Sequence, residues 1–521
     1  MRMTLFSQQE LILRSGYKYE LYDSIADDGY ITQVTRLINP LADKTKLRHP
    51  PLLFEHGGTI DPTAYLLASS IQHTPEPWPR RPTDGPIKSA NRSLAFLLAN
   101  HGFDVFLCES RGSNDLNTRH VKDRAAKSAL EGKNEDKNRT QAENMHELSR
   151  QWNFWSFTQD DIIAHELKSH IDTVLKVTGA DKVSVLTYSL STPTSFAFYS
   201  IRPDYARKTH AFVSMAPIVS GQGTSPLMTL ALKRICPLIP ETVGTMILSD
   251  LLLNQLTRDI AIVLFKPKWL RYTLFKMIEN LAMGASPQYR THIELNLIGH
   301  LLRRVSFRVG KQMCQQMASD RLQKYDYGPF KNKELYGTET PPAYDLSNLQ
   351  LKSWLLVSAW NDAVATPQIV DHLVRIVNPK PVAHVVAPYN HVDMIAGFEN
   401  DKYTNFPIMH YFEHMSYDPE ERSSAETTTR SLSIDLRQIF APLQSLNGNL
   451  FVANNQSEYR RAAQARSATE DVIRRLTLGP PFNAMARSFQ GGMRTMLERV
   501  NSVVKNPRID LPIQIVERND S

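Results

Sequence analysis

The chain has 521 residues, of which 42% are hydrophobic and 22% are charged. This balance excludes wholesale disorder, a collagen-like fibre and a small disulfide scaffold. The net charge of +7 comes from 60 basic and 53 acidic residues, and no run of five or six like charges occurs, so the sequence does not indicate nucleic-acid binding.

The N-terminal twenty residues contain no long apolar stretch after the first charges, so they do not predict a signal peptide. The longest uncharged stretch, Ala211–Leu232, is rich in Ser, Gly, Pro, Gln and Thr and predicts no membrane span. Cys108, Cys236 and Cys314 allow at most one disulfide, which leaves the redox compartment open.

Short apolar, β-branched runs alternate with helical patterns along much of the chain. The predicted strands are Pro51–Glu55, Phe103–Cys108, Lys182–Leu186, His210–Ser214, Ser353–Ser358 and Val382–Val386. The predicted helices between them include Arg92–His101, Asp160–Thr178 and Pro193–Ser200. Alternation at this spacing predicts an α/β fold, with a mostly parallel sheet covered by helices on both faces.

This alternation stops in residues 219–345, where helical patterns follow one another. They cover Ser225–Arg234, Val243–Leu256, Lys268–Ala282 and Thr291–Arg304. We therefore expect a helical cap inserted between two parts of one core, residues 1–218 and 346–415. Strand signals fade after Met415, so residues 416–521 are predicted to be a C-terminal extension, partly disordered.

Two insertions interrupt the first part of the core. His73–Ala90 contains five prolines and predicts an exposed loop. Arg119–Leu148 is highly charged and almost free of large apolar residues, so we expect it to be solvated.

The segment Thr187-Tyr-Ser189-Leu-Ser191 carries the sharpest chemical signal. Ser189 ends a predicted strand and precedes a predicted helix, which is where an α/β-hydrolase holds its nucleophile in a strained turn with small flanking residues. Thr187 and Ser191 are small, but neither is the usual Gly. Taken alone, the segment fits an ordinary turn between a strand and a helix better than a nucleophile elbow.

The loop after the first predicted strand, Glu55-His-Gly-Gly58, suits an oxyanion hole. We expect the backbone N–H groups of Gly58 and Leu190 to be its two donors. The same glycines would also serve a plain turn.

A nucleophilic serine needs a base and a carboxylate that orients the base. Asp362 and His391 follow the last two predicted strands, in the chain order Ser, Asp, His that this fold uses. Taken singly, Asp362 also fits a helix cap or turn, and His391 fits a surface or core histidine. Asp393 is too close to His391 in sequence to be its partner and is assigned a local structural role.

No other motif competes with this arrangement. The sequence has no Walker loop, no G-x-G-x-x-G after a strand, no H-E-x-x-H and no C-x-x-C. We therefore expect neither a metal ion nor an organic cofactor.

Several stretches resemble the acid lipase family, which comprises the gastric and lysosomal acid lipases and the yeast steryl ester hydrolases. The most specific of them are Lys324–Gly328, Leu335–Gly337, Pro341–Asp345, Asn361-Asp362 with Pro367, and Tyr389–Asp393. The resemblance covers roughly residues 8–413. It departs from the family at the elbow, where Thr187 and Ser191 replace Gly and Leu190 replaces Gln.

The resemblance implies an α/β-hydrolase core with a helical cap. It also implies hydrolysis of lipid esters such as triacylglycerols or steryl esters, with Ser189, Asp362 and His391 as the triad. The altered elbow favours a second hypothesis, a catalytically impaired hydrolase that binds lipid or a protein partner.

The expected partner is a lipid ester, with a lipid-droplet or membrane surface as a further candidate. Localisation stays open between two hypotheses. The missing signal peptide favours an intracellular protein, whereas the resemblance favours a secreted or lysosomal one.

Overall fold

The computed structural model describes thirteen stretches of the chain. They are residues 6–67, 74–80, 93–114, 117–122, 154–224, 229–241, 244, 279–280, 282–284, 300, 303–397, 399–416 and 451–453. These stretches belong to one compact unit that comprises residues 1–456. The remaining 65 residues form a second unit, which lies outside the described residues.

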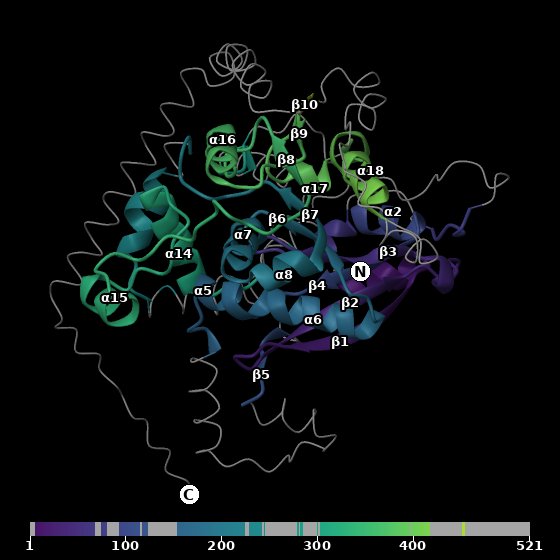
Figure 1. Ribbon diagram of the computed structural model, residues 1–521, viewed down its shortest axis with the longest axis horizontal. Helices are drawn as coiled ribbons and strands as arrows, with labels where there is room; N and C mark the ends of the chain where they lie inside the picture. The colour runs from purple at the N-terminus through teal and green to yellow at the C-terminus, as the bar shows by residue number, and fades with distance from the viewer. Residues whose placement is uncertain are drawn as a thin grey trace, which may run out of the picture. The chain divides into compact units, whose positions relative to one another are not determined.

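A central sheet organises the described residues (Figure 1). Its strands are β1 Lys18–Ile25, β2 Tyr30–Ile38, β3 Arg48–Glu55, β4 Phe103–Cys108, β5 Arg119–His120, β6 Val183–Tyr188, β7 Thr209–Met215, β8 Trp354–Ala359, β9 Ala383–Ala387 and β10 Phe451–Ala453. The strand order is β1-β2-β4-β3-β6-β7-β8-β9-β10, with β5 paired to β2.

The six strands predicted from the sequence form the parallel part of this sheet. From β4 through β3, β6, β7 and β8 to β9, every neighbouring pair is parallel. The additional strands pair antiparallel: β1 with β2, β2 with β4 and β5, and β10 with β9. The expected mostly parallel α/β sheet is therefore confirmed.

The centre of this sheet is buried on both faces because helices pack on it. All residues of β6 and β8 are buried, and α6 contacts β1, β3 and β6, while α2 contacts β2 and β4. The longer helices are α1 Gln8–Arg14, α2 Leu94–Asn100, α6 Leu167–Thr178, α7 Ser191–Ile201, α8 Pro203–Lys208, α14 Phe307–Ser319, α15 Pro329–Tyr336, α16 Pro367–Ile376 and α18 Phe406–Met415. Short elements include α5 Gln159–Asp161, α17 Asp393–Ala396, η1 Lys44–Lys46, η2 Pro62–Tyr65 and η9 Asp401–Asn405.

Two predicted helices differ in their geometry, and one of them is Ser225–Arg234, where η6 Thr229–Ile235 is a π-helix. Between α5 and α6, the element η5 Ile162–Glu166 is a π-helix rather than a continuous α-helix. Apolar periodicity over a single turn does not distinguish these two windings, so the sequence pattern predicts only a helix.

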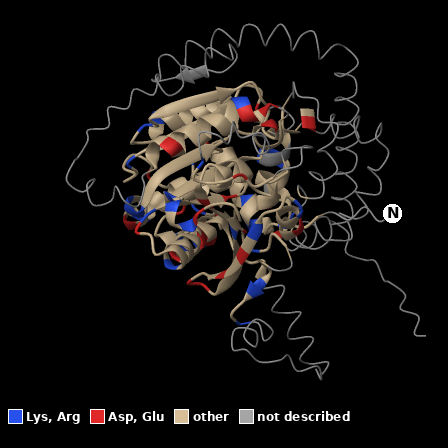
Figure 2. Ribbon diagram, turned by 90° about the vertical axis from the view of Figure 1, so that its right-hand side faces the viewer, with Lys and Arg blue, Asp and Glu red and all other residues tan. Residues whose placement is uncertain are grey.

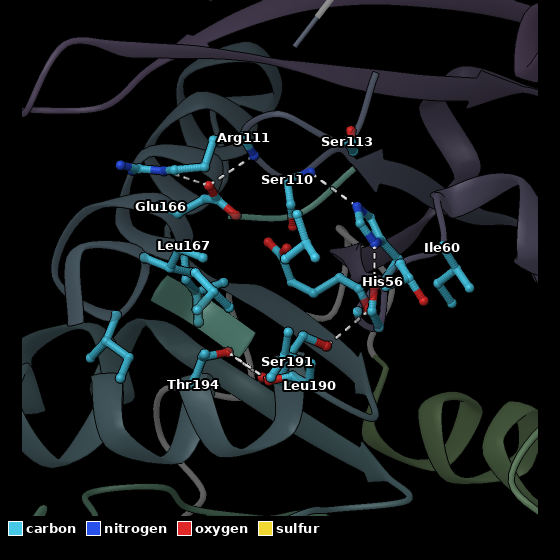
Figure 3. A pocket seen from close by; sticks show the side chains of 18 of the residues that line it. His56, Ile60, Ser110, Arg111, Ser113, Glu166, Leu167, Leu190, Ser191 and Thr194 are labelled. Carbon is cyan, nitrogen blue, oxygen red and sulfur yellow. Dashed lines mark hydrogen bonds and ion pairs between the residues drawn. The ribbon is translucent and has the colours of Figure 1, made fainter. Parts of the chain in front are cut away.

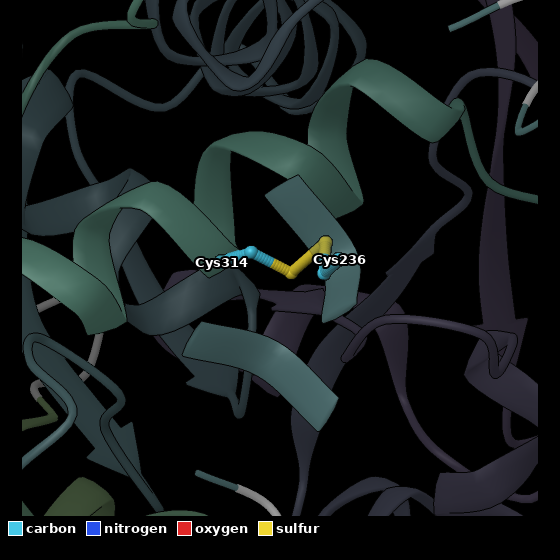
Figure 4. Close-up of a disulfide and its surroundings, with 2 residues drawn as sticks. All are labelled: Cys236 and Cys314. Atoms are coloured by element: carbon cyan, nitrogen blue, oxygen red, sulfur yellow. A yellow bond between two sulfur atoms is a disulfide. The ribbon is translucent and has the colours of Figure 1, made fainter. Parts of the chain in front are cut away.

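The described part of residues 219–345 consists of helices joined by irregular stretches. It contains η6 Thr229–Ile235, η7 Cys236–Leu238, α14 and α15, and a disulfide joins Cys236 to Cys314 across 78 residues (Figure 4). Most of the other helices predicted there fall outside the described residues, so the helical cap stays a prediction.

The other predicted segments are only partly covered. Residues 74–80 and 119–122 of the two insertions are described, and residues 451–453 of the predicted C-terminal extension form β10.

Basic and acidic residues are interspersed along the described parts of the chain (Figure 2). This mixture agrees with the mild net charge of the chain. None of the helices in the described part of the chain has the length and apolar character that crossing a bilayer requires.

Candidate active site

Ser189 lies in a sharp turn between β6 and α7. Its φ of +58° is in the left-handed region, which costs a residue with a side chain about 1–2 kcal/mol. The backbone around it compensates, because the Ser189 N–H donates to the Met215 carbonyl at 2.9 Å and the Thr192 N–H donates to the Ser189 carbonyl at 3.0 Å.

The two unusual flanks of Ser189 have hydrogen-bond partners. Thr187 is fully buried and its hydroxyl donates to the Val213 carbonyl at 3.3 Å. The Ser191 hydroxyl accepts from the Tyr188 N–H at 2.9 Å. Both hydroxyls therefore fit into the turn without leaving a buried polar group unpaired.

The predicted acid and base meet Ser189 at the carboxyl end of the sheet. His391 Nε2 lies 2.8 Å from Ser189 Oγ, and His391 Nδ1 lies 2.8 Å from Asp362 Oδ2. The other carboxylate oxygen of Asp362 accepts the N–H groups of Val364 and Ala365 at 2.8 and 2.7 Å. This arrangement holds the ring so that Nδ1 carries a proton and Nε2 can accept one from the serine hydroxyl.

The backbone behind His391 is also held. The Tyr188 hydroxyl donates to the His391 carbonyl at 2.8 Å. Asn390 and Asp393 exchange hydrogen bonds, because the Asp393 N–H donates to the Asn390 side chain and the Asn390 N–H donates to the Asp393 carboxylate. The local structural role expected of Asp393 agrees with this exchange.

The loop after β3 presents Gly58 beside the elbow. His56 Nδ1 donates to the Gly57 carbonyl at 2.8 Å, and His56 Nε2 accepts from the Ser110 N–H at 3.0 Å. Burial lowers the pKa of His56, which favours the neutral ring that this pair of bonds requires. Because C=O and N–H point in opposite directions across a trans peptide, fixing the Gly57 carbonyl turns the Gly58 N–H away from His56.

Gly58 and Leu190 are the two expected oxyanion donors. Neither backbone N–H has a hydrogen-bond acceptor among the residues that the structure describes. The two residues are in close contact, since a Cβ on Gly58 would lie 3.0 Å from Leu190 Cδ2. A Cβ on Gly57 would lie 2.9 Å from the Cβ of Ser189, so the close approach of this loop to the elbow requires glycine.

A possible metal-ligand set lies beneath this loop, formed by Glu55, Cys108 and His170. Glu55 already contacts His170 Nδ1 at 2.6 Å, and Thr32 contacts the other ring nitrogen at 2.9 Å. Burial raises the pKa of the Cys108 thiol well above its ordinary value. These contacts favour a hydrogen-bonded core over a metal site, because a metal would need the thiolate and a free histidine nitrogen.

Sequence reasoning missed a contact from residues 279–284 to the site. The Met283 carbonyl accepts the N–H groups of His391 and Ala363, both at 3.2 Å. The Asn390 side chain donates to Glu279 and to the Gly284 carbonyl, both at 2.9 Å. We call residues 279–280 and 282–284 the brace, since they join the loop of the acid to the loop of the histidine.

A second contact from residues 219–345 reaches the oxyanion loop. Asp61 is fully buried and pairs with His300 at 3.0 Å and with Arg303. The Arg303 N–H donates to the Thr59 carbonyl at 2.9 Å. No local pattern links these positions, which are some 240 residues apart, so only an alignment of related sequences could have indicated them.

Comparison with known proteins supports the expected relationship, although no protein-family model matches the chain. The chain is 26% identical to gastric triacylglycerol lipase of Mus musculus over 410 residues, which cover 74% of this chain and 86% of that protein. It is 25% identical to lipase member K of Homo sapiens over 397 residues, with the same coverage of both proteins. Among solved structures, a putative lipase from Sulfolobus solfataricus gives a TM-score of 0.42 at 11% identity, covering 76% of this chain and 99% of that one.

The sequence relationship confirms the resemblance seen in the motifs, and the strand order with Ser189 at its elbow is that of an α/β-hydrolase. The chain is therefore a distant homologue of the gastric triacylglycerol lipases and adopts the α/β-hydrolase fold.

Proposed function

We propose that this protein hydrolyses the carboxylic esters of lipids, such as triacylglycerols or steryl esters, with Ser189 as nucleophile. One observation carries the proposal: the His391 ring contacts both Ser189 Oγ and Asp362 Oδ2 at 2.8 Å. Lipase relatives covering 74% of the chain support the same class of reaction.

The proposed reaction has two halves. Ser189 Oγ attacks the ester carbonyl carbon while His391 Nε2 takes the hydroxyl proton, and the N–H groups of Gly58 and Leu190 stabilise the oxyanion. The intermediate then expels the alcohol, which takes its proton from His391. A water molecule deprotonated by His391 attacks the acyl-enzyme, which releases the carboxylic acid and restores the Ser189 hydroxyl.

The competing hypothesis is an impaired hydrolase that acts as a lipid- or protein-binding module. It rests on Thr187 and Ser191 in place of the usual elbow glycines. The hydrogen bonds of both hydroxyls argue against it, since neither side chain forces Ser189 away from His391.

The first test is hydrolysis of p-nitrophenyl acyl esters from acetate to palmitate between pH 4 and pH 8. Ser189→Ala is expected to lower kcat by at least about 10³-fold. Ser200→Ala is the matched control, because Ser200 lies at the far end of the same helix and donates only to the Ala197 carbonyl. A folded wild type that hydrolyses none of the esters would favour the binding module.

We also propose which surface of the protein contacts the lipid that contains the substrate. A water-insoluble ester brings the protein to a lipid-droplet or membrane surface, and we assign this contact to residues 219–345, the proposed cap. Phe330 and Leu238 are 93% and 76% exposed there. Flotation with triolein emulsions should recover the wild type, and a Phe330→Ser, Leu238→Ser variant should float several-fold less.

A further inference from the structure

The loop after β3 contains a strained residue directly after the proposed oxyanion donor Gly58. Thr59 has a φ of +58°, in the left-handed region. Of the four non-glycine residues with positive φ in the described part of the chain, Thr59 is the one with a β-branched side chain, which that region tolerates least. The Thr59 side chain is exposed, so its burial does not offset the strain. Contacts of the loop on either side must therefore hold this conformation.

Arg303 holds the loop on the side that follows Gly58. Its backbone N–H donates to the Thr59 carbonyl at 2.9 Å. Its guanidinium pairs with Asp61, whose carboxylate also contacts the His300 ring at 3.0 Å. Arg303 therefore binds this loop at two points, two residues apart, and fixes the backbone on both sides of the residue between them.

Gly58 lies between two fixed parts of the loop. On one side, His56 donates to the Gly57 carbonyl at 2.8 Å. On the other side, Arg303 holds the Thr59 carbonyl. If Thr59 relaxed to a negative φ, the chain between these contacts would have to rotate at Gly58, and glycine resists such rotation least. The strained conformation of Thr59 is thus linked to the direction of the Gly58 N–H, and strain of this kind persists where surrounding contacts enforce it.

The segment that carries Arg303 is itself anchored beside the site. The Ser306 hydroxyl lies 2.8 Å from the carbonyl oxygens of both Trp155 and Phe157. Residues 304 and 305 line the same small pocket as Gly58 and Leu190 (Figure 3). Arg303 therefore reaches the loop from a fixed position next to the proposed oxyanion hole.

We propose that Arg303, together with Asp61, is a positioning residue that keeps Thr59 in the left-handed region and thereby directs the Gly58 N–H toward the ester carbonyl oxygen. This inference rests on the proposed ester hydrolysis. It adds that a residue of 219–345, the proposed cap, completes the oxyanion hole by holding its backbone rather than by contacting the ester.

The first test measures kcat and KM for p-nitrophenyl butyrate on the full-length protein in three backgrounds. Arg303→Met removes the charge at similar side-chain length and should lower kcat about tenfold, with KM changed less than about twofold. In a Thr59→Gly background the same change should cost less than about threefold, because glycine adopts the left-handed region without strain. In a Thr59→Ala background the loss of about tenfold should remain. Equal losses in the Gly and Ala backgrounds overturn the proposal.

The second test compares p-nitrophenyl acetate with its thionoester, in which sulfur replaces the carbonyl oxygen. Sulfur accepts hydrogen bonds weakly, so the thionoester gains little from an oxyanion hole. Arg303→Met should therefore lower kcat for the ester about threefold more, or beyond, than kcat for the thionoester. A general loss of structure would lower both alike, and that outcome overturns the proposal.

Arg202→Met is the matched control, because Arg202 pairs with Asp204 at 2.8 Å beyond the far end of α7. It should change neither kcat nor the ratio between the two esters. If Arg303→Met fails to fold because the buried Asp61 loses a partner, the Asp61→Asn, Arg303→Met variant replaces it, since it removes both charges. The same outcomes then support or overturn the proposal.

Hydrogen exchange separates this inference from the proposed function. If the wild type shows no Ser189-dependent hydrolysis, the proposed function is wrong, and amide exchange in the peptide of residues 55–66 then decides the role of Arg303. Arg303→Met should speed this exchange about fivefold or more, and Arg202→Met should leave it unchanged. Equal exchange in wild type and Arg303→Met shows that Arg303 does not hold the loop and overturns the proposal.

Discussion

At the scale of single residues, the elbow is stabilised by hydrogen bonds from side chains at the two positions where the acid lipases have glycine. The Ser191 hydroxyl accepts a hydrogen bond from the Tyr188 N–H, and the Tyr188 hydroxyl donates to the His391 carbonyl. Tyr188 and Ser191, which flank Ser189 in the chain, thus connect the turn to the backbone of the proposed base. This explains how an elbow without flanking glycines keeps Ser189 2.8 Å from His391.

His56 is predicted to orient the Gly58 N–H, one of the two proposed oxyanion donors. His56→Ala removes the donor to the Gly57 carbonyl, frees that peptide to rotate and should lower kcat about 10²-fold with KM nearly unchanged. His56→Asn keeps an N–H donor near the Nδ1 position and should recover part of the loss. Steady-state kinetics on the three proteins checks this, and equal rates for the Ala and Asn variants would contradict it.

Glu109 is predicted to make stability depend on pH. Burial, and then the charge of Asp61, raises the pKa of Glu109 to about 8, whereas the unfolded chain has an ordinary value of about 4.3. Between these values the folded state holds a proton that the unfolded state has lost, so the free energy of unfolding falls as pH rises.

Glu109→Gln removes this titration. From pH 5 to pH 8 the wild type should lose about 1–3 kcal/mol more unfolding free energy than the variant. Urea unfolding at both pH values measures the difference. Glu334→Gln, at an exposed position on α15, serves as the control and should follow the wild type. Parallel curves for wild type and Glu109→Gln would refute the assignment.

At the scale of elements, the brace connects two loops that follow different strands. Asp362 follows β8 and His391 follows β9, and the Met283 carbonyl accepts an N–H from each loop. Gly284 comes next, with a φ of +103°, and a Cβ there would lie 1.8 Å from the Asn361 carbonyl oxygen. Only glycine therefore allows the brace to approach the acid loop this closely.

Gly284→Ala is expected to push the brace away from both loops and to lower kcat about tenfold or more. The rate at which a fluorophosphonate labels Ser189 should fall by the same factor, because it reports the competence of the nucleophile directly. Gly310→Ala in α14 is the matched control, since a Cβ there meets no atom within 4 Å. Unchanged labelling in a folded Gly284→Ala protein would show that the brace does not position the site.

At the scale of the whole molecule, the disulfide joins two helical segments far apart in sequence. Cys236 in η7 and Cys314 in α14 close a loop across 78 residues. Such a link lowers the conformational entropy of the unfolded chain and can stabilise the folded state by up to about 4 kcal/mol. The Cys236→Ser, Cys314→Ser variant should unfold at lower denaturant than the wild type. Reductant should shift the wild type toward the variant and leave the variant itself unchanged, and a reductant-insensitive wild type would argue against the link.

Local sequence patterns predicted the parallel strands, the elbow at Ser189 and the order of the proposed triad. These features depend on short apolar runs and on which residues a turn tolerates, and both are visible within ten residues. The edge strand β1 lacked such a signal because most of its residues are exposed or half-buried. The π-helix η5 was predicted only as a helix, since one turn of apolar spacing fits both windings.

The sequence by itself therefore determined the fold class, the relationship to the acid lipases and the chemistry proposed for Ser189, Asp362 and His391. Only the tertiary structure decided which groups support them: the ring of His56, the brace at Met283, and the Asp61 pair with His300 and Arg303. The reason is physical. A hydrogen bond or an apolar wall formed by residues a hundred or more positions apart leaves no periodicity in the chain, and it exists only once the strands bring those residues together.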